Sequence, residues 1–355
     1  MRRRDFIRYL GLGSVAVTIP EAMHAVPAVA TTLRSDKKTR PISGSWFEFQ
    51  HSAAEGGYWN EALAHFTADQ WRRKVFEIRE VGMEYLVLMG VARAGKPFYP
   101  SKIAPRIPMG CDDPLEAVLS AADECGIKFF VSNDFWGDLD AYNMMLDKGV
   151  QTIRFQAMEE IAERYSHHAC FYGWYFPNEA MLKPYFVDAC VNYVNETAAF
   201  AQRLTPNCVN LIAPYFIKEA RFDDHFVRQL EKMNIDIIAY QDGVGVNHTS
   251  LEDSAKFYEI LYKAHEKACR ARLWADVELF YFEDGTGGNL LPADFGKRII
   301  RQLEAVSPYV DKVLCYQYLG IMNKPDTDIV AGHPDSIKLY EQYTEWYNRY
   351  QKKCQ

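Results

Sequence analysis

Two glutamates stand at the ends of apolar segments that have the composition of buried β-strands. Glu179 follows the aromatic run at residues 171–176, which is broken by Pro177. Apolar and aromatic neighbours desolvate a carboxyl group and favour its protonated form. A protonated carboxyl group at a strand end is suited to general acid catalysis near neutral pH.

Glu278 stands near the end of a second such segment, residues 272–279. Side chains alternate between the two faces of a strand, so Trp274, Asp276 and Glu278 share one face. The opposite face is apolar, which is typical of a strand that packs against helices. We therefore expect Glu278 to be the inward residue nearest to the end of its strand.

The elements that must position these glutamates alternate along the chain from Ile42 onward. Short apolar runs predict eight strands, at residues 42–49, 85–91, 128–132, 171–176, 208–213, 236–240, 272–279 and 312–318. Amphipathic stretches predict helices between and after them, at residues 67–82, 113–126, 150–165, 185–204, 218–233, 250–271, 292–306 and 335–350.

Capping signals support two of these helices. Thr67 and Gln70 have the spacing of a capping box. Asp113 is an N-cap residue, Pro114 takes the first helical position, and Gly126 ends the second helix.

Eight strands that each precede a helix predict an α/β fold, a single (β/α)₈ TIM barrel over residues 41–355. An open doubly wound sheet is the main alternative. It usually carries a glycine-rich phosphate turn after its first strand, whereas here the first strand runs into Glu48, Phe49, Gln50 and His51. The barrel is therefore favoured.

Barrel chemistry takes place at the C-terminal ends of the strands, where the fourth and seventh strands face each other across the opening. Asn178 and Glu179 after the fourth strand, and Glu278 ending the seventh, resemble the clan of retaining glycoside hydrolases built on the (β/α)₈ barrel. The resemblance implies that Glu179 is the general acid/base and Glu278 the nucleophile that forms a covalent glycosyl-enzyme. Their carboxyl groups would then lie ~5–5.5 Å apart. The chain also resembles exported barrel proteins of gut-type bacteria.

The same resemblance implies three binding roles. Asn178 would hold the sugar 2-hydroxyl, Tyr240 would hydrogen-bond the nucleophile, and Arg93 would lie near that carboxylate. The sequence departs from the clan at the eighth strand, where a tryptophan is replaced by residues 316–318, and at the third strand, which ends in Asn133.

Further polar and aromatic residues near strand ends are candidates for binding sugar hydroxyls or stacking on sugar rings. They are Trp46, Glu48, Asn133, Trp136, Tyr215, Asp242 and Gln317, with Asp134, Glu283, Tyr58, Trp59 and Tyr281 as additional rim candidates. Structural alternatives exist for both glutamates. Glu179 could cap the following helix, and Glu278 could form an ion pair with Arg93. Asp276 is interpreted as structural.

Two other functions remain open. A metal-dependent sugar isomerase or epimerase would ligate an ion through Glu179, Asp276, Glu278 and a histidine. Only His51 and His248 lie near predicted strand ends, no HxH or HExxH spacing occurs, and the eight cysteines are scattered, so we predict no metal site and no cofactor. A carbohydrate-binding barrel without turnover is the third possibility.

Charge and the N-terminal segment bear on partners and location. The net charge of −7, with no dense basic stretch beyond the first residues, argues against a nucleic-acid partner and favours a glycoside, oligosaccharide or polysaccharide. Residues 3–8, RRDFIR, resemble a twin-arginine export signal, and the apolar run at 10–19 is too short for a permanent membrane span. We predict an export signal at 1–30, a linker at 31–40, and a periplasmic or extracellular protein.

Overall fold

The computed structural model describes residues 39–52, 57–285 and 288–353. The predicted export signal at 1–30 and most of the predicted linker at 31–40 lie outside the described residues, so both stay predictions. No helix within the described residues is long and apolar enough to cross a membrane.

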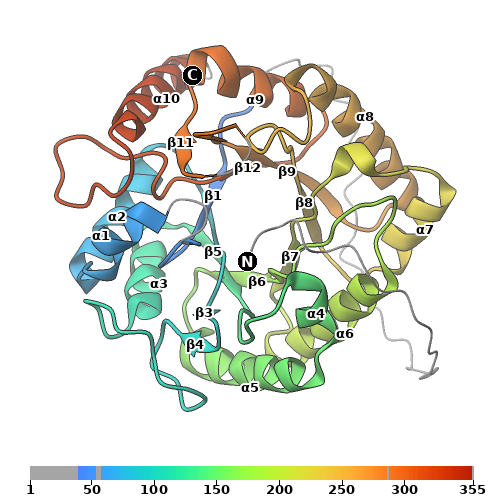
Figure 1. The fold of residues 1–355 in the computed structure, drawn as a ribbon, viewed down its shortest axis with the longest axis horizontal. Helices are drawn as coiled ribbons and strands as arrows, with labels where there is room; N and C mark the ends of the chain where they lie inside the picture. Colours follow the sequence, from blue (N-terminus) through green and yellow to red (C-terminus); the bar gives the residue numbers. More distant parts are fainter. Residues whose placement is uncertain (1–38, 53–56, 286–287, 354–355) are drawn as a thin grey trace.

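Eight parallel strands close into a barrel, which confirms the predicted (β/α)₈ fold (Figure 1). The order around the barrel is β1, β12, β9, β8, β7, β6, β5, β2. Each predicted strand is present, with these bounds: β1 Gly44–Phe47, β2 Tyr85–Leu88, β5 Lys128–Ser132, β6 Phe171–Tyr175, β7 Val209–Ile212, β8 Ile237–Gln241, β9 Arg272–Glu278 and β12 Val313–Tyr316.

Helices surround the barrel on its outer side (Figure 1). They are α1 Asn60–Ala64, α2 Ala68–Glu80, α3 Pro114–Cys125, α4 Ala141–Leu146, α5 Lys148–Tyr165, α6 Asp188–Leu204, α7 Asp224–Lys232, α8 Leu251–Ala268, α9 Ile300–Val306 and α10 Asp335–Lys352, with 3-10 turns η2 Gly57–Trp59 and η3 Ile217–Glu219 and the π-helical turn η4 Phe295–Ile299. The helix predicted from residue 292 begins later, because residues 290–292 pair with 280–282 as a strand.

The predicted capping signals are confirmed. Thr67 and Gln70 form a reciprocal capping box at the start of α2. Asp113 accepts a hydrogen bond from the backbone N–H of Glu116 at the start of α3, and Gly126 ends that helix with a left-handed φ of 72°. These contacts fix where two helices begin and therefore how they meet the barrel.

The inside of the barrel is a packed aromatic and aliphatic core. Tyr85 and Trp274 meet edge to face with ring centroids 5.0 Å apart, and Trp46 meets Tyr175 in the same way at 5.7 Å. Trp46 is therefore a core residue, 1% exposed, rather than a stacking platform for sugars. Because side chains fill the inside of the barrel, a ligand has to bind beyond the strand ends.

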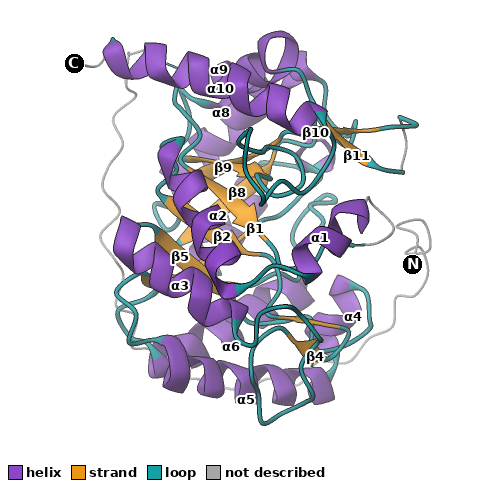
Figure 2. Ribbon diagram, turned by 90° about the vertical axis from the view of Figure 1, so that its left-hand side faces the viewer, coloured by secondary structure: helices purple, strands orange, loops and turns teal. Residues whose placement is uncertain are grey.

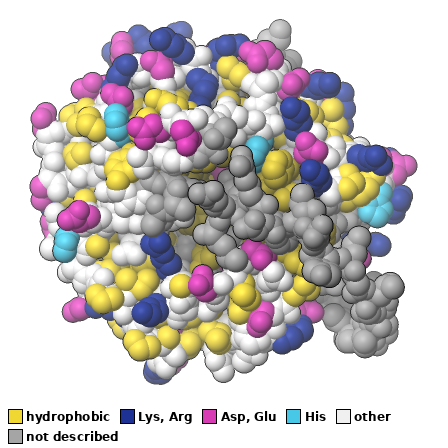
Figure 3. Space-filling model, viewed as in Figure 1, with side chains coloured by type: hydrophobic (Ala, Val, Ile, Leu, Met, Phe, Trp, Pro, Cys, Tyr) yellow, Lys and Arg dark blue, Asp and Glu magenta, His cyan; other side chains and the backbone are white. Residues whose placement is uncertain are grey.

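Two short hairpins extend from the ends of β2 and β9 on one side of the barrel (Figure 2). The first pairs β3 Ala92–Arg93 with β4 Lys96–Pro97, and the second pairs β10 Phe280–Phe282 with β11 Leu290–Pro292. On the face shown in Figure 3, Lys and Arg side chains are interspersed with Asp and Glu rather than gathered in one patch.

Candidate active site

A cavity of about 430 Å³ lies at the C-terminal ends of the strands. This volume falls within the range of small-molecule sites, about 300–1,000 Å³. Its polar lining includes Glu48, Gln50, His51, Arg93, Asp138, Glu179, Gln241, Asp276, Glu278 and Tyr316, and its apolar lining includes Met89, Phe98, Phe135, Leu139, Phe280, Phe282 and Leu290. The cavity thus contains both predicted glutamates.

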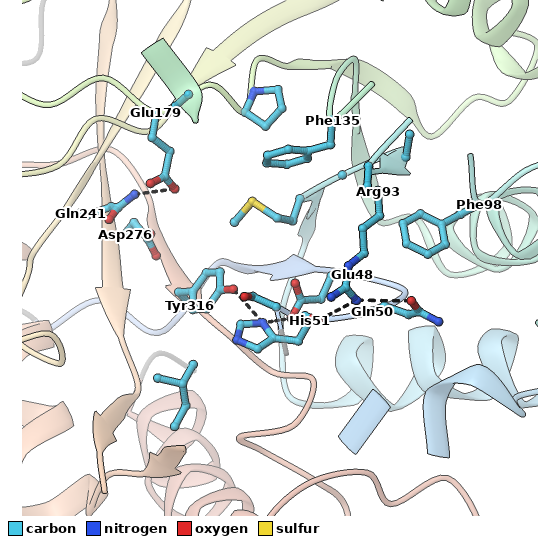
Figure 4. A pocket seen from close by; sticks show the side chains of 18 of the residues that line it. Glu48, Gln50, His51, Arg93, Phe98, Phe135, Glu179, Gln241, Asp276 and Tyr316 are labelled. Carbon is cyan, nitrogen blue, oxygen red and sulfur yellow. Dashed lines mark hydrogen bonds and ion pairs between the residues drawn. The ribbon is translucent and has the colours of Figure 1, made fainter. Parts of the chain in front are cut away.

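Glu179 lies on one wall of the cavity, where its carboxylate accepts a hydrogen bond from Gln241 (Figure 4). The Gln241 Nε2 to Glu179 Oε1 distance is 2.9 Å, and the same amide donates to the carbonyl of Ala213 at 3.2 Å. The alternative that Glu179 caps the following helix is wrong, because α6 begins at Asp188. Glu179 therefore faces the cavity rather than a helix end.

Glu278 ends β9 on the inward face, as the alternation of its strand predicts. Trp274 belongs to the core inside the barrel, while Leu273, Ala275 and Val277 pack on the helices outside. The Glu278 carboxylate accepts a hydrogen bond from the backbone N–H of Val246 at 2.9 Å. A backbone donor of this kind favours the charged carboxylate.

Arg93 does not form the expected ion pair with Glu278. Its Nη1 donates instead to the carbonyl of His51 at 3.0 Å and to Gln50 at 3.4 Å, across the cavity from Glu179 (Figure 4). The arginine beside the nucleophile candidate is Arg298, which donates to the carbonyl of Glu278 at 2.9 Å. The sequence gives no signal for this contact, because it depends on how a π-helical turn meets β9.

Asp276 lines the cavity, which the structural interpretation of this residue did not anticipate. Burial raises the pKa of Asp276 well above its usual value, and the charges of Glu278, Asp242 and Glu179 raise it further. Both glutamates therefore affect the pKa of Asp276: Glu278 at the end of β9 and Glu179 in the segment after β6.

Asp242 is hydrogen-bonded to the backbone of Glu278 and does not line the cavity. It accepts hydrogen bonds from Gln302 Nε2 at 2.6 Å and from the backbone N–H of Glu278 at 3.3 Å. Burial raises the pKa of Asp242 to about 6, although the bond from Gln302 lowers it. The predicted substrate-binding role of Asp242 is replaced by a positioning role.

Gly245 lets the loop after β8 cross over Glu278. A Cβ atom at this position would lie 2.4 Å from the carbonyl oxygen of Phe280 and 2.9 Å from the Cβ of Glu278. Gly245→Ala is therefore expected to displace Glu278 and the Val246 N–H, with a loss of about 10²-fold in kcat/KM. Gly296→Ala is the control, because its Cβ would make only ordinary contact, at 3.5 Å. Equal kinetics for the two variants would contradict this prediction.

Tyr240 does not hydrogen-bond the nucleophile, and that expectation is wrong. Ile237 and Ala239 face the inside of the barrel, so Tyr240 faces the helices. Its hydroxyl meets His265 Nε2 of α8 at 3.0 Å. Gln241, the next residue along the chain, lines the cavity instead and could have been found from the same alternation.

His265 makes the structure sensitive to acid. Burial lowers the pKa of His265 to about 4, because the charged imidazole would lie in a dry core. The neutral ring stabilises the fold above pH ~6.5, and this contribution, about 3 kcal/mol, is lost as the pH falls through 4. We expect His265→Gln to lose less stability than the wild type between pH 7 and 4 in urea unfolding, and His65→Gln, at an exposed site, to behave as the wild type. If the wild type, His265→Gln and His65→Gln all lose the same stability between pH 7 and 4, this prediction is wrong.

Asn178 points away from the cavity, into a buried polar network. Its Nδ2 donates to Asp134 at 2.6 Å, and Arg154 of α5 pairs with the same carboxylate. Asp134 also accepts from the backbone N–H groups of Phe135 and Trp136. The network fixes the segments after β5 and β6, so Asn178 positions Glu179 rather than binding a 2-hydroxyl.

Three other predicted binding residues do not line the cavity. Asn133 is fully buried against Met158, and Trp136 packs edge to face on Tyr99. The backbone of Tyr215 forms a β-bridge with Met181, and its ring meets Phe216 in a tilted arrangement. Each stands near a strand end, as predicted, but contacts other parts of the fold instead of the cavity.

Glu48, His51, Gln317 and Tyr316 form a connected polar group on the wall opposite Glu179 (Figure 4). Glu48 Oε1 meets His51 Nδ1 at 2.6 Å and accepts a hydrogen bond from the Gln317 amide. The Tyr316 hydroxyl meets His51 Nδ1 at 3.2 Å. Glu48 lines the cavity as predicted, and Gln317 holds it from behind.

Groups of three His, Cys, Asp or Glu side chains able to hold a metal ion do occur within the described residues. They comprise Glu116, His167 and His168, and Asp123, His168 and Cys170. No member of either group lines the cavity. The ligand set expected for a metal-dependent isomerase, which combines Glu179, Asp276 and Glu278, does not converge in the described part of the chain.

The closed parallel barrel and a polar cavity beyond its strand ends define a (β/α)₈-barrel protein of the architecture that many enzymes share. The chain belongs to the family described as a domain of unknown function, DUF4434, whose model matches residues 42–328. No curated protein sequence matches it.

Solved structures with the same fold include glycoside hydrolases. A candidate α-L-fucosidase from Bacteroides thetaiotaomicron aligns with a TM-score of 0.66 and 15% identity, over 95% of this chain and 99% of that one. An endo-1,4-β-mannanase from Rhizomucor miehei aligns with a TM-score of 0.55 and 9% identity, over 87% and 95%. A β-galactosidase from Marinomonas ef1 aligns with a TM-score of 0.57 and 12% identity, over 88% and 60%. The predicted resemblance to barrel glycoside hydrolases is confirmed at the level of the fold.

Proposed function

We propose that the protein is a retaining glycoside hydrolase in which Glu278 is the nucleophile and Glu179 the general acid/base. The observation that carries this proposal is that both glutamates line one cavity at the strand ends. Cleavage of a glycosidic bond requires two carboxyl groups that face one space large enough for a sugar. The shared fold with solved glycoside hydrolases supports the proposal.

In the first step, a Glu278 oxygen attacks the anomeric carbon while Glu179 gives its proton to the departing glycosidic oxygen. The bond between the anomeric carbon and that oxygen breaks, and a covalent ester to Glu278 forms. In the second step, Glu179 takes a proton from water, which attacks the anomeric carbon and releases Glu278. The Val246 N–H donates a hydrogen bond to the Glu278 carboxylate and so helps to orient the nucleophile.

Neutral hydroxyl-rich ligands suit the remaining lining. Glu48, Gln50 and Tyr316 offer donors and acceptors for hydroxyl groups, and Phe135 and Phe280 offer flat apolar faces. We therefore propose a glycoside, oligosaccharide or polysaccharide as the substrate.

The proposal is tested with aryl glycosides of many sugars in both anomeric forms, followed by NMR of the first sugar released. We expect hydrolysis of at least one glycoside with retention of anomeric configuration. Inversion would reject the covalent intermediate and leave a hydrolase. Oligosaccharide binding without any turnover would favour a carbohydrate-binding barrel, and activity lost to a chelator would favour the metal-dependent alternative.

A further inference from the structure

A second group of ligand-type side chains lies at the opposite end of the barrel from the cavity. His167 and His168 occupy the turn between α5 and β6, next to α3, which carries Glu116 in its first turn and Asp123 further along. One ligand atom from each of Glu116, His167 and His168 lies within 4.8 Å of the others. The proposed hydrolase chemistry makes no use of this group.

The two nitrogens of the His168 ring have different surroundings. Nδ1 meets Asp123 Oδ2 at 2.7 Å, which is a hydrogen-bond distance that leaves no room for an ion. Nε2 lies 3.2 Å from Glu116 Oε2. Two ligand atoms about 2.0–2.1 Å from a tetrahedral zinc ion are about 3.3 Å apart, so the spacing between His168 Nε2 and Glu116 Oε2 is close to that of two ligands of one zinc ion.

We propose that Glu116, His167 and the Nε2 atom of His168 bind a Zn²⁺ ion. Asp123 acts as the outer-shell carboxylate, because it fixes the orientation and tautomer of His168 through Nδ1, an arrangement found at most protein zinc sites. His167 is exposed, so the fourth position of the tetrahedron faces solvent and takes water.

The overlapping group of Asp123, His168 and Cys170 does not form the site. It would require Nδ1 of His168, which is already engaged by Asp123. The Cys170 thiol is buried and meets the carbonyl of Leu119 at 3.3 Å, while the Cys170 N–H donates to Asp123 at 2.6 Å. Cys170 therefore helps to hold the outer-shell carboxylate in place.

The bound ion would join the first turn of α3 to the segment that leads into β6. Because the active-site candidates lie at the other end of β6, the ion would contribute to stability rather than to the reaction. The proposal is independent of the hydrolase assignment, and it differs from the sequence-based expectation of no metal site. Adjacent histidines at 167 and 168 give no ligand spacing that sequence reasoning recognises, since Glu116 reaches them only through the fold.

The full chain, stripped of metal with a chelator and dialysed, is titrated with ZnCl₂ in a calorimeter and melted with and without zinc. We expect one Zn²⁺ per chain and a higher Tm in its presence. His167→Ala should fold as the wild type without zinc, because this side chain is exposed, yet bind zinc at least about 10-fold more weakly. His225→Ala, which removes an exposed histidine elsewhere, should bind as the wild type.

Two more measurements separate a coordinated ion from general surface binding. Co²⁺ in the site should give the visible absorption of a tetrahedral complex, and Glu116→Gln should remove it. Asp123→Asn keeps the three ligands and should weaken zinc binding by about 10–100-fold. The proposal is overturned if no zinc binds at one equivalent, if His167→Ala binds as tightly as the wild type, or if His225→Ala weakens binding equally.

Discussion

Glu278→Gln is expected to remove nearly all hydrolysis of every aryl glycoside that the wild type cleaves. An amide cannot form the covalent ester, so the loss should not depend on how good the leaving group is. The neutral side chain has nearly the shape of the original and keeps an acceptor oxygen for the Val246 N–H. The loss should therefore appear in kcat with the Tm little changed.

Glu179→Gln should show a different pattern, because a general acid matters only when the departing oxygen needs a proton. We expect a loss of about 10²–10⁴-fold on glycosides with poor leaving groups and a much smaller loss on dinitrophenyl glycosides in the first step. The measurement is kcat/KM across a series of phenols for both variants. If kcat/KM depends on the leaving group in the same way for both variants, the roles assigned to Glu179 and Glu278 are wrong.

Glu283→Gln is the matched control for both changes, since Glu283 is exposed on the hairpin after β10 and does not line the cavity. We expect wild-type kinetics from it. A loss at Glu283 equal to that at Glu278, or most activity kept in Glu278→Gln, would show that another rim carboxylate is the nucleophile.

Arg154→Leu is expected to destabilise the protein by about 3–5 kcal/mol, because it leaves a buried carboxylate without its counter-ion. Asp134 and Arg154 are both fully buried, and Arg154 also donates to the carbonyl of Met144 at 2.7 Å and lies over the Tyr193 ring at 4.7 Å. Burial already raises the pKa of Asp134, which the neighbouring guanidinium and Asn178 hold down. Urea unfolding at pH 7 measures the change.

Two comparisons test the cause. Asp134→Asn combined with Arg154→Leu should cost less than Arg154→Leu alone, because no uncompensated charge is left in the core. Arg349→Leu breaks an exposed pair with Glu345 and should cost at most about 1 kcal/mol. If the double variant is the least stable of the three, packing rather than charge explains the effect of Arg154.

The barrel could be predicted from the sequence because its signals are local. Each strand is a short apolar run, and capping residues such as Thr67 and Asp113 mark where helices begin. Alternation within β9 also placed Asp276 and Glu278 on the inner face, since a strand that is paired on both sides has no freedom to rotate.

Long-range contacts explain what could not be predicted. Asn178 and Arg93 stand at strand ends, but their partners are Asp134 and the His51 carbonyl, which only the closed barrel brings near. Gln241 was missed for a different reason, because the predicted sixth strand stopped one residue early, at Tyr240. A shift of a single residue exchanges the side chain that faces the cavity for one that faces a helix.

The raised pKa of Asp276 favours the protonated form of a carboxyl group that lines the pocket. A protonated carboxylic acid can donate a hydrogen bond, whereas an ionised carboxylate can only accept one. When Asp276 is protonated, a sugar hydroxyl whose oxygen accepts from Asp276 and whose hydrogen is donated to a neighbouring carboxylate makes both hydrogen bonds. The same hydroxyl turned the other way makes neither. The polarity of hydroxyls, and not only the shape of the ring, would then decide which way round a sugar enters.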